Sequence, residues 1–213
     1  MDLYSYWRSS ASYRVRIALH LKQLDFTYQP VCLLPSHSEQ KSPAYQQLNP
    51  NQLVPTLVDG DLVLSQSLAI IEYLDEQYQG ISLVPKAGQA RYLVKSLSQD
   101  LAIDIHPLNN LRVMEYLRAE LDINNLDRQG WYHHWLKVGF DALEKKLAHR
   151  KGAFCMGDNV TMVDLCLIPQ MYNARRFEFD LKHYSRLKEI EQACLELDAF
   201  QKALPERQPD ANS

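Results

Sequence analysis

Short apolar runs alternate with helical spacings in the first third of the chain. Apolar and aromatic side chains over residues 3–7 predict a strand, and apolar positions spaced by three and four over residues 12–22 predict a helix. A second strand is expected over residues 26–32. The chain therefore begins with a β-α-β pattern.

The next segments predict a hairpin and a helix. Residues 56–58 and 62–64 are apolar runs on either side of Asp59-Gly60, a dipeptide typical of a tight hairpin turn. A short helix is expected near residues 44–48, and helical spacing returns over residues 67–78. The βαβ and ββα patterns together predict a small mixed sheet.

Beyond a linker at residues 80–88, which contains Pro85, almost every periodic segment is helical. We therefore expect an α/β domain over residues 1–80 and an all-helical domain over residues 89–213, with a disordered tail after Pro205. Thr161 and Asp164 form a helix-start signature, whose expected role is in folding. The alternative is that Asp164 is a catalytic acid.

Composition narrows the functional classes. The chain has 213 residues, 46% of them hydrophobic, and a net charge of −3, which argues against a general nucleic-acid binder. It has neither an apolar run long enough to cross a membrane nor a signal-peptide pattern, so we expect a cytoplasmic location. Its four cysteines form no C-x-x-C pair, so no metal site is expected, and the thiols should be reduced and mostly buried.

Candidate chemistry begins where the first strand meets the first helix. Ser9, Ser10 and Ser12 lie at the expected helix start, where unpaired backbone N–H groups and the helix dipole attract an anion. Arg8 and Arg14 add positive charge on either side. The alternative is an ordinary serine N-cap on a surface helix.

Two further positions could contact a ligand. Pro55 directly precedes a strand, so the Val54-Pro55 bond is a candidate for the cis form, with the Val54 backbone turned towards an extended peptide. A trans proline that only opens the strand is the alternative. Gln66 and Ser67 precede the next helix and offer a second helix-start anion site, although Ser67 could simply be an N-cap.

The chain resembles the zeta class of cytosolic glutathione transferases. The resemblance rests on Tyr6-Trp7-Arg8-Ser9-Ser10-Ala11-Ser12-Tyr13-Arg14-Val15-Arg16, which matches the Ser-Ser-Cys-x-x-Arg signature of that class at every fixed position but one. It extends over nearly the whole chain and includes Val54-Pro55, Gln66-Ser67, the Thr161/Asp164 pair and residues 173–177. Ala11 stands where the family usually has cysteine, which puts in doubt any mechanism that relies on an enzyme thiol.

The resemblance implies a thioredoxin-like domain joined to a helical domain, usually as a homodimer, with glutathione as the cofactor. Ser10 would donate a hydrogen bond to the glutathione sulfur, with Ser9 as its close competitor. The resemblance further implies two groups of ligand-contacting residues: Gln52, Val54, Gln66 and Ser67 for glutathione, and Arg8 and Arg176 for substrate carboxylates. For Arg175 and Arg176 the alternative is a solvated helix face. Arg14 and Arg16 are expected to be structural or surface residues.

The segment around His106 and Asn110 is expected to be helical and resembles the matching stretch of bacterial zeta-class isomerases. The spacing of four residues would place both side chains on one helix face, where they could contact bound ligand. A packing role for His106 is the alternative.

The resemblance implies glutathione-dependent isomerisation of maleylacetoacetate, a small dicarboxylate, to fumarylacetoacetate in aromatic amino acid breakdown. The alternatives are maleylpyruvate isomerisation, dehalogenation of small α-halo acids, and a binding protein that has kept the fold without catalysis. Ala11 favours the last of these, whereas Ser10, Gln66 and Arg8 argue against it.

Overall fold

The computed structural model describes residues 1–211 of the chain, and these form two compact units. The first contains Met1–Leu83 together with the stretch from Leu195 onward, and the second is Val84–Cys194. The change of unit at Leu83 falls inside the linker expected from the sequence. The division differs from the expected one at the C-terminus, because the stretch after Cys194 returns to the first unit.

The first unit contains a four-stranded mixed sheet of strand order β2-β1-β3-β4. Its strands are β1 (Asp2–Ser5), β2 (Thr27–Pro30), β3 (Thr56–Asp59) and β4 (Leu62–Ser65). Strand β1 pairs in parallel with β2 and antiparallel with β3, and β3 and β4 form the expected hairpin around Gly60. This is the thioredoxin-like arrangement predicted from the sequence.

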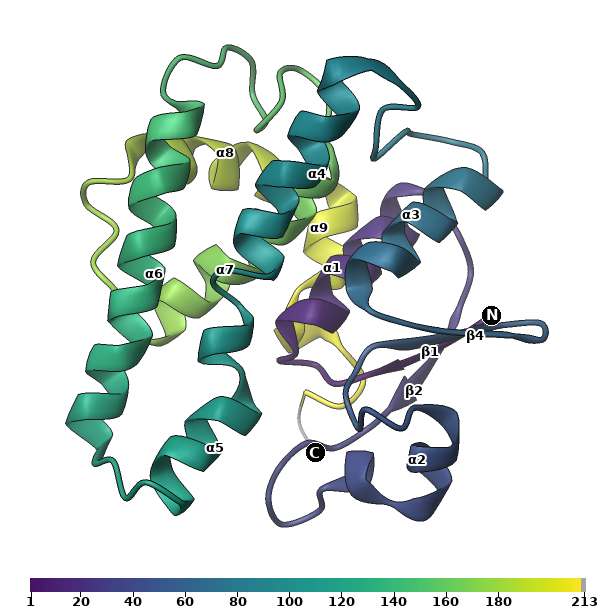
Figure 1. The fold of residues 1–213 in the computed structure, drawn as a ribbon. Coiled ribbons are helices and arrows are strands. Elements are labelled where there is room, and N and C mark those ends of the chain that lie inside the picture. Colours follow the sequence, from purple (N-terminus) through teal and green to yellow (C-terminus); the bar gives the residue numbers. More distant parts are fainter. Residues whose placement is uncertain (212–213) are drawn as a thin grey trace. The chain divides into compact units, whose positions relative to one another are not determined.

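Helices cover the sheet and supply its core. Helices α1 (Ser10–Leu21) and α3 (Ser67–Gln77) lie together on one side of the sheet, and α2 (Pro43–Leu48) lies towards the other side (Figure 1). The apolar positions of α1 and α3 that face the sheet are fully buried, as is Leu57 of β3. This packing holds α1 in place, and α1 begins directly after the loop that carries Arg8 and Ser9.

The expectation of a disordered tail after Pro205 is wrong for residues 206–211, which are ordered. The rest of that tail lies outside the described residues. Helix α9 (Asp198–Ala203) packs on α1, and a short 3-10 helix follows over Pro205–Arg207. The buried Arg16 guanidinium donates to the Ala203 carbonyl at 3.2 Å. Gln208 donates to the carbonyls of Lys202 and Leu204. Polar contacts, which hydrophobic periodicity does not reveal, therefore hold this tail.

The second unit is helical. Its elements are α4 (Gly88–Ala102), a 3-10 turn (Pro107–Asn109), α5 (Leu111–Ala119), α6 (Asn125–Leu147), α7 (Met162–Arg176) and α8 (Ser185–Leu195). Helix α7 is buried along most of its length and packs against α4. Cys155, Cys166 and Cys194 are buried free thiols, and Cys32 of the first unit is half-buried.

Asp164 has a structural role at the start of α7. Its fully buried carboxylate accepts hydrogen bonds from the Thr161 and Cys155 backbone N–H groups, both at 2.8 Å, and from the Thr161 hydroxyl at 3.1 Å. Burial nevertheless raises the pKa of Asp164. The carboxylate closes the loop before α7 onto the helix start, as the capping signature predicts.

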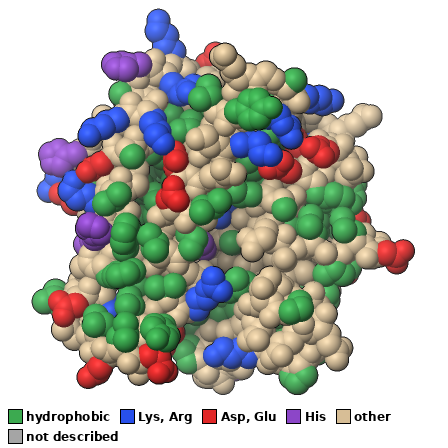
Figure 2. Space-filling view, viewed as in Figure 1, with side chains coloured by type: hydrophobic (Ala, Val, Ile, Leu, Met, Phe, Trp, Pro, Cys, Tyr) green, Lys and Arg blue, Asp and Glu red, His purple; other side chains and the backbone are tan. Residues whose placement is uncertain are grey.

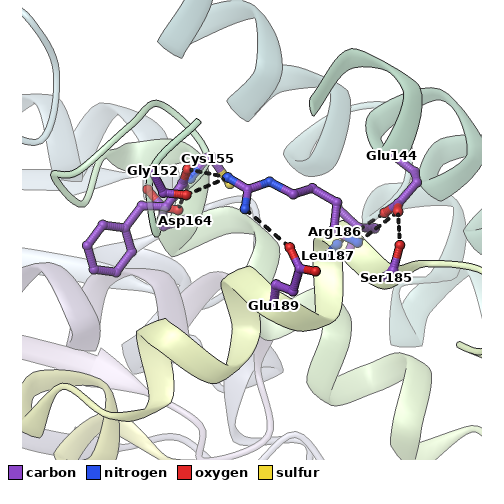
Figure 3. A network of polar contacts seen from close by, with 9 residues as sticks. Glu144, Gly152, Cys155, Asp164, Ser185, Arg186, Leu187 and Glu189 are labelled. Carbon is purple, nitrogen blue, oxygen red and sulfur yellow. Dashed lines mark hydrogen bonds and ion pairs between the residues drawn. The ribbon is translucent and has the colours of Figure 1, made fainter. Parts of the chain in front are cut away.

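A neighbouring network fixes α8 (Figure 3). The Glu144 carboxylate of α6 accepts from the backbone N–H groups of Arg186 and Leu187 at the start of α8, at 2.8 and 3.1 Å. The Arg186 guanidinium donates to the Gly152 carbonyl at 2.8 Å. These contacts tie α6, α8 and the loop before α7 together, so we assign them to folding.

The helical unit also has exposed apolar side chains. Hydrophobic side chains gather over α5 and α6 (Figure 2). The exposed large ones are Leu111 and Tyr116 of α5, Leu121 of the loop that follows, and Leu126 and Val138 of α6. No helix among residues 1–211 is both long and apolar enough to cross a membrane.

Candidate active site

The loop before α1 presents two serines with different roles. Ser9 is the N-cap of α1, and its hydroxyl oxygen accepts a hydrogen bond from the Ser12 backbone N–H at 3.2 Å. Ser10 is the first residue of the helix and is 6% exposed. The first turn of α1 contains no acidic residue, so no side-chain carboxylate there neutralises the positive end of the helix dipole. This helix start can therefore stabilise an anion.

Arg8 is held directly beside these serines. Its guanidinium donates to the Tyr6 hydroxyl at 3.3 Å and lies 4.4 Å from the centre of the Trp7 ring. Stacking on an indole ring restricts the guanidinium without using all of its N–H donors. Arg8 can therefore bind a carboxylate from a restricted set of conformations.

Arg14 connects the two helix starts that the sequence predicts as anion sites. It lies one turn after Ser10 on α1 and is almost fully buried, and its guanidinium donates to the Ser67 hydroxyl at 3.2 Å. Ser67 is the first residue of α3, after Gln66, whose φ is 74°. A buried permanent cation at this point favours an anionic ligand at the start of α3.

Of the two roles expected for Arg14 and Arg16, structural or surface, the surface one is excluded, because both guanidinium groups are buried in the first unit. The sequence indicated the positive charge of Arg14 beside the first helix start but not its contact with Ser67 at the second. The available signal was its spacing of four residues from Ser10, inside the apolar run of α1, where a charged residue needs polar partners.

Side-chain hydrogen bonds hold the loop before β3 in place. The Val54-Pro55 bond is cis, the form for which the sequence made it a candidate. The Tyr45 hydroxyl and the Asn49 amide donate to the Leu53 carbonyl, at 2.7 and 2.8 Å. The Val54 side chain packs in a cluster with Tyr6 and Tyr45. Gln52 lies in the same loop, with a positive φ of 57°.

His106, Asn110 and Arg176 belong to the helical unit. The segment around His106 is not the single helix that the sequence predicts, because Pro107 opens a 3-10 turn and Asn110 becomes the N-cap of α5. Asn110 and His106 still meet, with Nδ2 and Nε2 3.4 Å apart. Arg176 ends α7, with its guanidinium 4.8 Å from the centre of the Phe177 ring. Its neighbour Arg175 forms an ion pair with Glu191.

A buried glutamine fixes the orientation of the His106 ring. Gln170 of α7 places its side-chain amide 3.3 Å from His106 Nδ1, and its Oε1 has no partner among residues 1–211. Rotating the amide by 180° lets Oε1 accept from an Nδ1–H group, which also leaves Nε2 to accept from Asn110. The neutral Nδ1–H tautomer therefore satisfies both contacts.

Known proteins include relatives that are similar over nearly the whole chain. Residues 8–77 match the family model described as "Glutathione S-transferase, N-terminal domain". A probable maleylacetoacetate isomerase of Vibrio cholerae is 50% identical over 98% of this chain and 97% of its own.

Two solved structures are similar over the whole chain. A zeta-class maleylpyruvate isomerase, in its holo form, is 43% identical, with a TM-score of 0.95 over 99% of this chain and all of its own. A maleylacetoacetate isomerase of Methylobacterium extorquens with bound malonate and glutathione is 38% identical, with a TM-score of 0.93 over the full length of both chains.

Proposed function

Since the chain belongs to the zeta class of the glutathione transferases, we propose that it is a glutathione-dependent isomerase that converts maleylacetoacetate to fumarylacetoacetate in aromatic amino acid breakdown. The observation that carries the proposal is the start of α1, where Ser10 begins a helix without first-turn acids and Arg8 is held directly before it.

The residues of the first unit fit glutathione. The tripeptide has carboxylates, amides and a thiol, and the unit offers a partner of matching chemistry for each. Arg14, Ser67 and Gln66 suit the γ-glutamyl end, since a buried cation and a helix start both favour a carboxylate. No hydrogen bond among residues 1–211 involves the Val54 backbone groups, which suit the cysteinyl amide. Gln52 lies in the same loop and is the proposed further contact.

Ser10 stabilises the thiolate. Glutathione, when bound, supplies a sulfur that adds to the cis double bond, permits rotation about the resulting single bond and leaves again. The thiol of free cysteine has a pKa of about 8.5, so only a few per cent is ionised at neutral pH. A hydrogen bond from Ser10, together with the helix end, lowers that pKa. Ser9 contributes less directly, because its oxygen already caps α1.

Cationic residues bind the substrate carboxylates. Arg8 and Arg176 are the proposed partners, since a guanidinium stays charged at all relevant pH values and can bind a carboxylate with two parallel hydrogen bonds. His106 and Asn110 are proposed to contact the bound ligand through polar groups that their mutual contact orients. None of these roles needs a thiol at position 11, so Ala11 is compatible with activity.

Maleylpyruvate is the second candidate substrate. It is favoured by the TM-score of 0.95 to a maleylpyruvate isomerase, and its chemistry would use the same thiolate and guanidinium groups. A non-catalytic binding protein would not require Ser10 to lie at the helix start.

We further propose a homodimer located in the cytoplasm. Each unit exposes a pair of neighbouring large apolar residues, which are Leu62 and Val63 of β4, and Tyr92 and Leu93 of α4. Exposed large apolar side chains are candidates for an interface between subunits. Light scattering on a size-exclusion column tests the dimer, and a mass near 24.7 kDa would refute it.

The isomerase proposal is tested with purified protein and both substrates. We expect an initial rate that depends on glutathione, with no net consumption of glutathione. Binding of glutathione without turnover of either substrate would instead support the binding-protein alternative.

A further inference from the structure

A carboxylate from the C-terminal tail contacts the loop that precedes the catalytic serines. Asp210 is 8% exposed, although the tail around it is polar. One carboxylate oxygen accepts from the Trp7 backbone N–H at 3.1 Å, and the other accepts from the Tyr28 hydroxyl at 2.6 Å. Asp210, 203 residues further along the chain, therefore binds the backbone of Trp7 in this loop.

The backbone carbonyls of Tyr6 and Trp7 are held by a second side chain. The buried Arg16 guanidinium donates to the Trp7 carbonyl at 2.9 Å and to the Tyr6 carbonyl at 3.4 Å. The Tyr6 carbonyl also accepts from the Ser9 backbone N–H at 2.9 Å. Both peptide groups of Trp7 are thus fixed, one by Arg16 and the other by Asp210, and the same network restrains Ser9.

The hydrogen bond from Tyr28 to Asp210 does not depend on pH near neutrality. Burial, and then the hydrogen bond to Asp210, raise the pKa of Tyr28 well above its usual value. The hydroxyl therefore stays protonated and remains a donor throughout the range in which such enzymes work.

We propose that Asp210 is a positioning residue for the isomerase reaction: its carboxylate fixes the Trp7 peptide, and through it the placement of Arg8 and of the Ser9–Ser10 helix start. This inference rests on the proposed function. The link to Arg8 is physical, since the Arg8 guanidinium lies over the Trp7 ring. The link to Ser10 is the short loop, in which the Ser9 N–H is bonded to Tyr6.

The test compares Asp210→Ala with Asp210→Asn. Asparagine keeps an oxygen for the Trp7 N–H and presents its amide to the Tyr28 hydroxyl, so it should rescue the function that alanine loses. Asp25→Ala is the matched control, because it makes the same chemical change at an exposed carboxylate of the same unit. Three measurements are made on each variant: kcat and KM, the pKa of the bound glutathione thiol from its ultraviolet absorbance, and amide hydrogen exchange at Trp7 without ligand.

For Asp210→Ala we expect faster exchange at Trp7, a raised thiol pKa, and a kcat lower by about tenfold with little change in the KM for glutathione, because a misplaced loop weakens transition-state contacts. Asp210→Asn and Asp25→Ala should remain within about twofold of wild type in kcat. Wild-type exchange and kcat in Asp210→Ala would overturn the proposal. So would an equal loss of activity in Asp210→Asn, or a loss that only follows the melting temperature.

The proposed function can fail separately. If wild type turns over neither substrate, the isomerase assignment fails. Exchange at Trp7 and the thiol pKa then still decide whether Asp210 positions the loop, since neither depends on turnover.

Discussion

Replacing Ser10 by alanine should remove the hydrogen bond proposed to stabilise the thiolate and leave the fold intact. Ser10 is the first residue of α1 and does not cap it, because the Ser9 hydroxyl does that. The substitution therefore removes one donor from the site, while alanine remains a good helix former. The backbone N–H groups of the first turn still attract the anion after this change.

The size of the effect follows from the lost contact. A hydrogen bond to a charged group contributes about 1.5–3 kcal/mol, and one pKa unit corresponds to about 1.4 kcal/mol, so the thiol pKa should rise by about one to two units. Because the helix end remains, the pKa should stay below that of a free thiol, and a rise from about 6.5 to about 8.0 lowers the thiolate fraction at pH 7 roughly eightfold. We therefore expect kcat at pH 7 to fall by about that factor, with partial recovery at higher pH.

Ser9→Ala is the matched control. It removes the N-cap, which costs about 1 kcal/mol and lowers the melting temperature by about 2–4 °C, but it keeps the Ser10 hydroxyl. The assay is the initial rate of isomerisation across a pH series, with thermal unfolding measured in parallel. A wild-type rate for Ser10→Ala, or a collapse for Ser9→Ala alone, would refute the reasoning.

Three further predictions concern polar groups that are buried or half-buried. Arg14→Met should weaken glutathione binding about tenfold in calorimetry, because it removes the cation that donates to Ser67 at the proposed γ-glutamyl site. The melting temperature should not fall, since an apolar side chain replaces a buried charge. Unchanged affinity would contradict the role given to Arg14. Asp164→Ala should lower the free energy of unfolding by about 3 kcal/mol in a denaturant titration, since it leaves two backbone N–H groups unpaired. The control is Asp158→Ala, at an exposed residue, which should leave that free energy unchanged. Equal losses in the two variants would refute the capping role of Asp164. Burial, followed by Lys202 and Arg16, lowers the pKa of His20, so the unfolded chain binds more protons and stability should rise with pH up to about 6.5. His20→Gln should flatten this rise in pH-dependent thermal unfolding, and a slope as steep as that of wild type would show that other groups cause it.

Local patterns predicted much of the first unit. The strand before α1, the Asp59-Gly60 hairpin and the start of α3 all have short-range signals, and the structure has each of them close to its expected place. The Thr161/Asp164 signature is local in the same way, since all its partners lie within nine residues of Asp164. Such elements can be predicted because the residues that stabilise them are neighbours in the sequence.

Contacts across long separations could not be predicted in this way. The order of the tail depends on Asp210 meeting Trp7 and Tyr28, and no periodicity in a polar, proline-containing segment indicates those partners. The burial of Arg14 likewise depends on Ser67, 53 residues away. Around His106, helical spacing did not predict the structure, because regular helix ends at Ala102, Pro107 opens a 3-10 turn and Asn110 caps α5.

The central claim is that the chain uses glutathione to isomerise a small cis dicarboxylate. The most direct measurement is the initial rate with maleylacetoacetate and with maleylpyruvate, each with and without glutathione, with the total glutathione measured before and after. The account predicts turnover of at least one substrate only when glutathione is present, with its total amount unchanged. Turnover without glutathione, or none with either substrate, would contradict it.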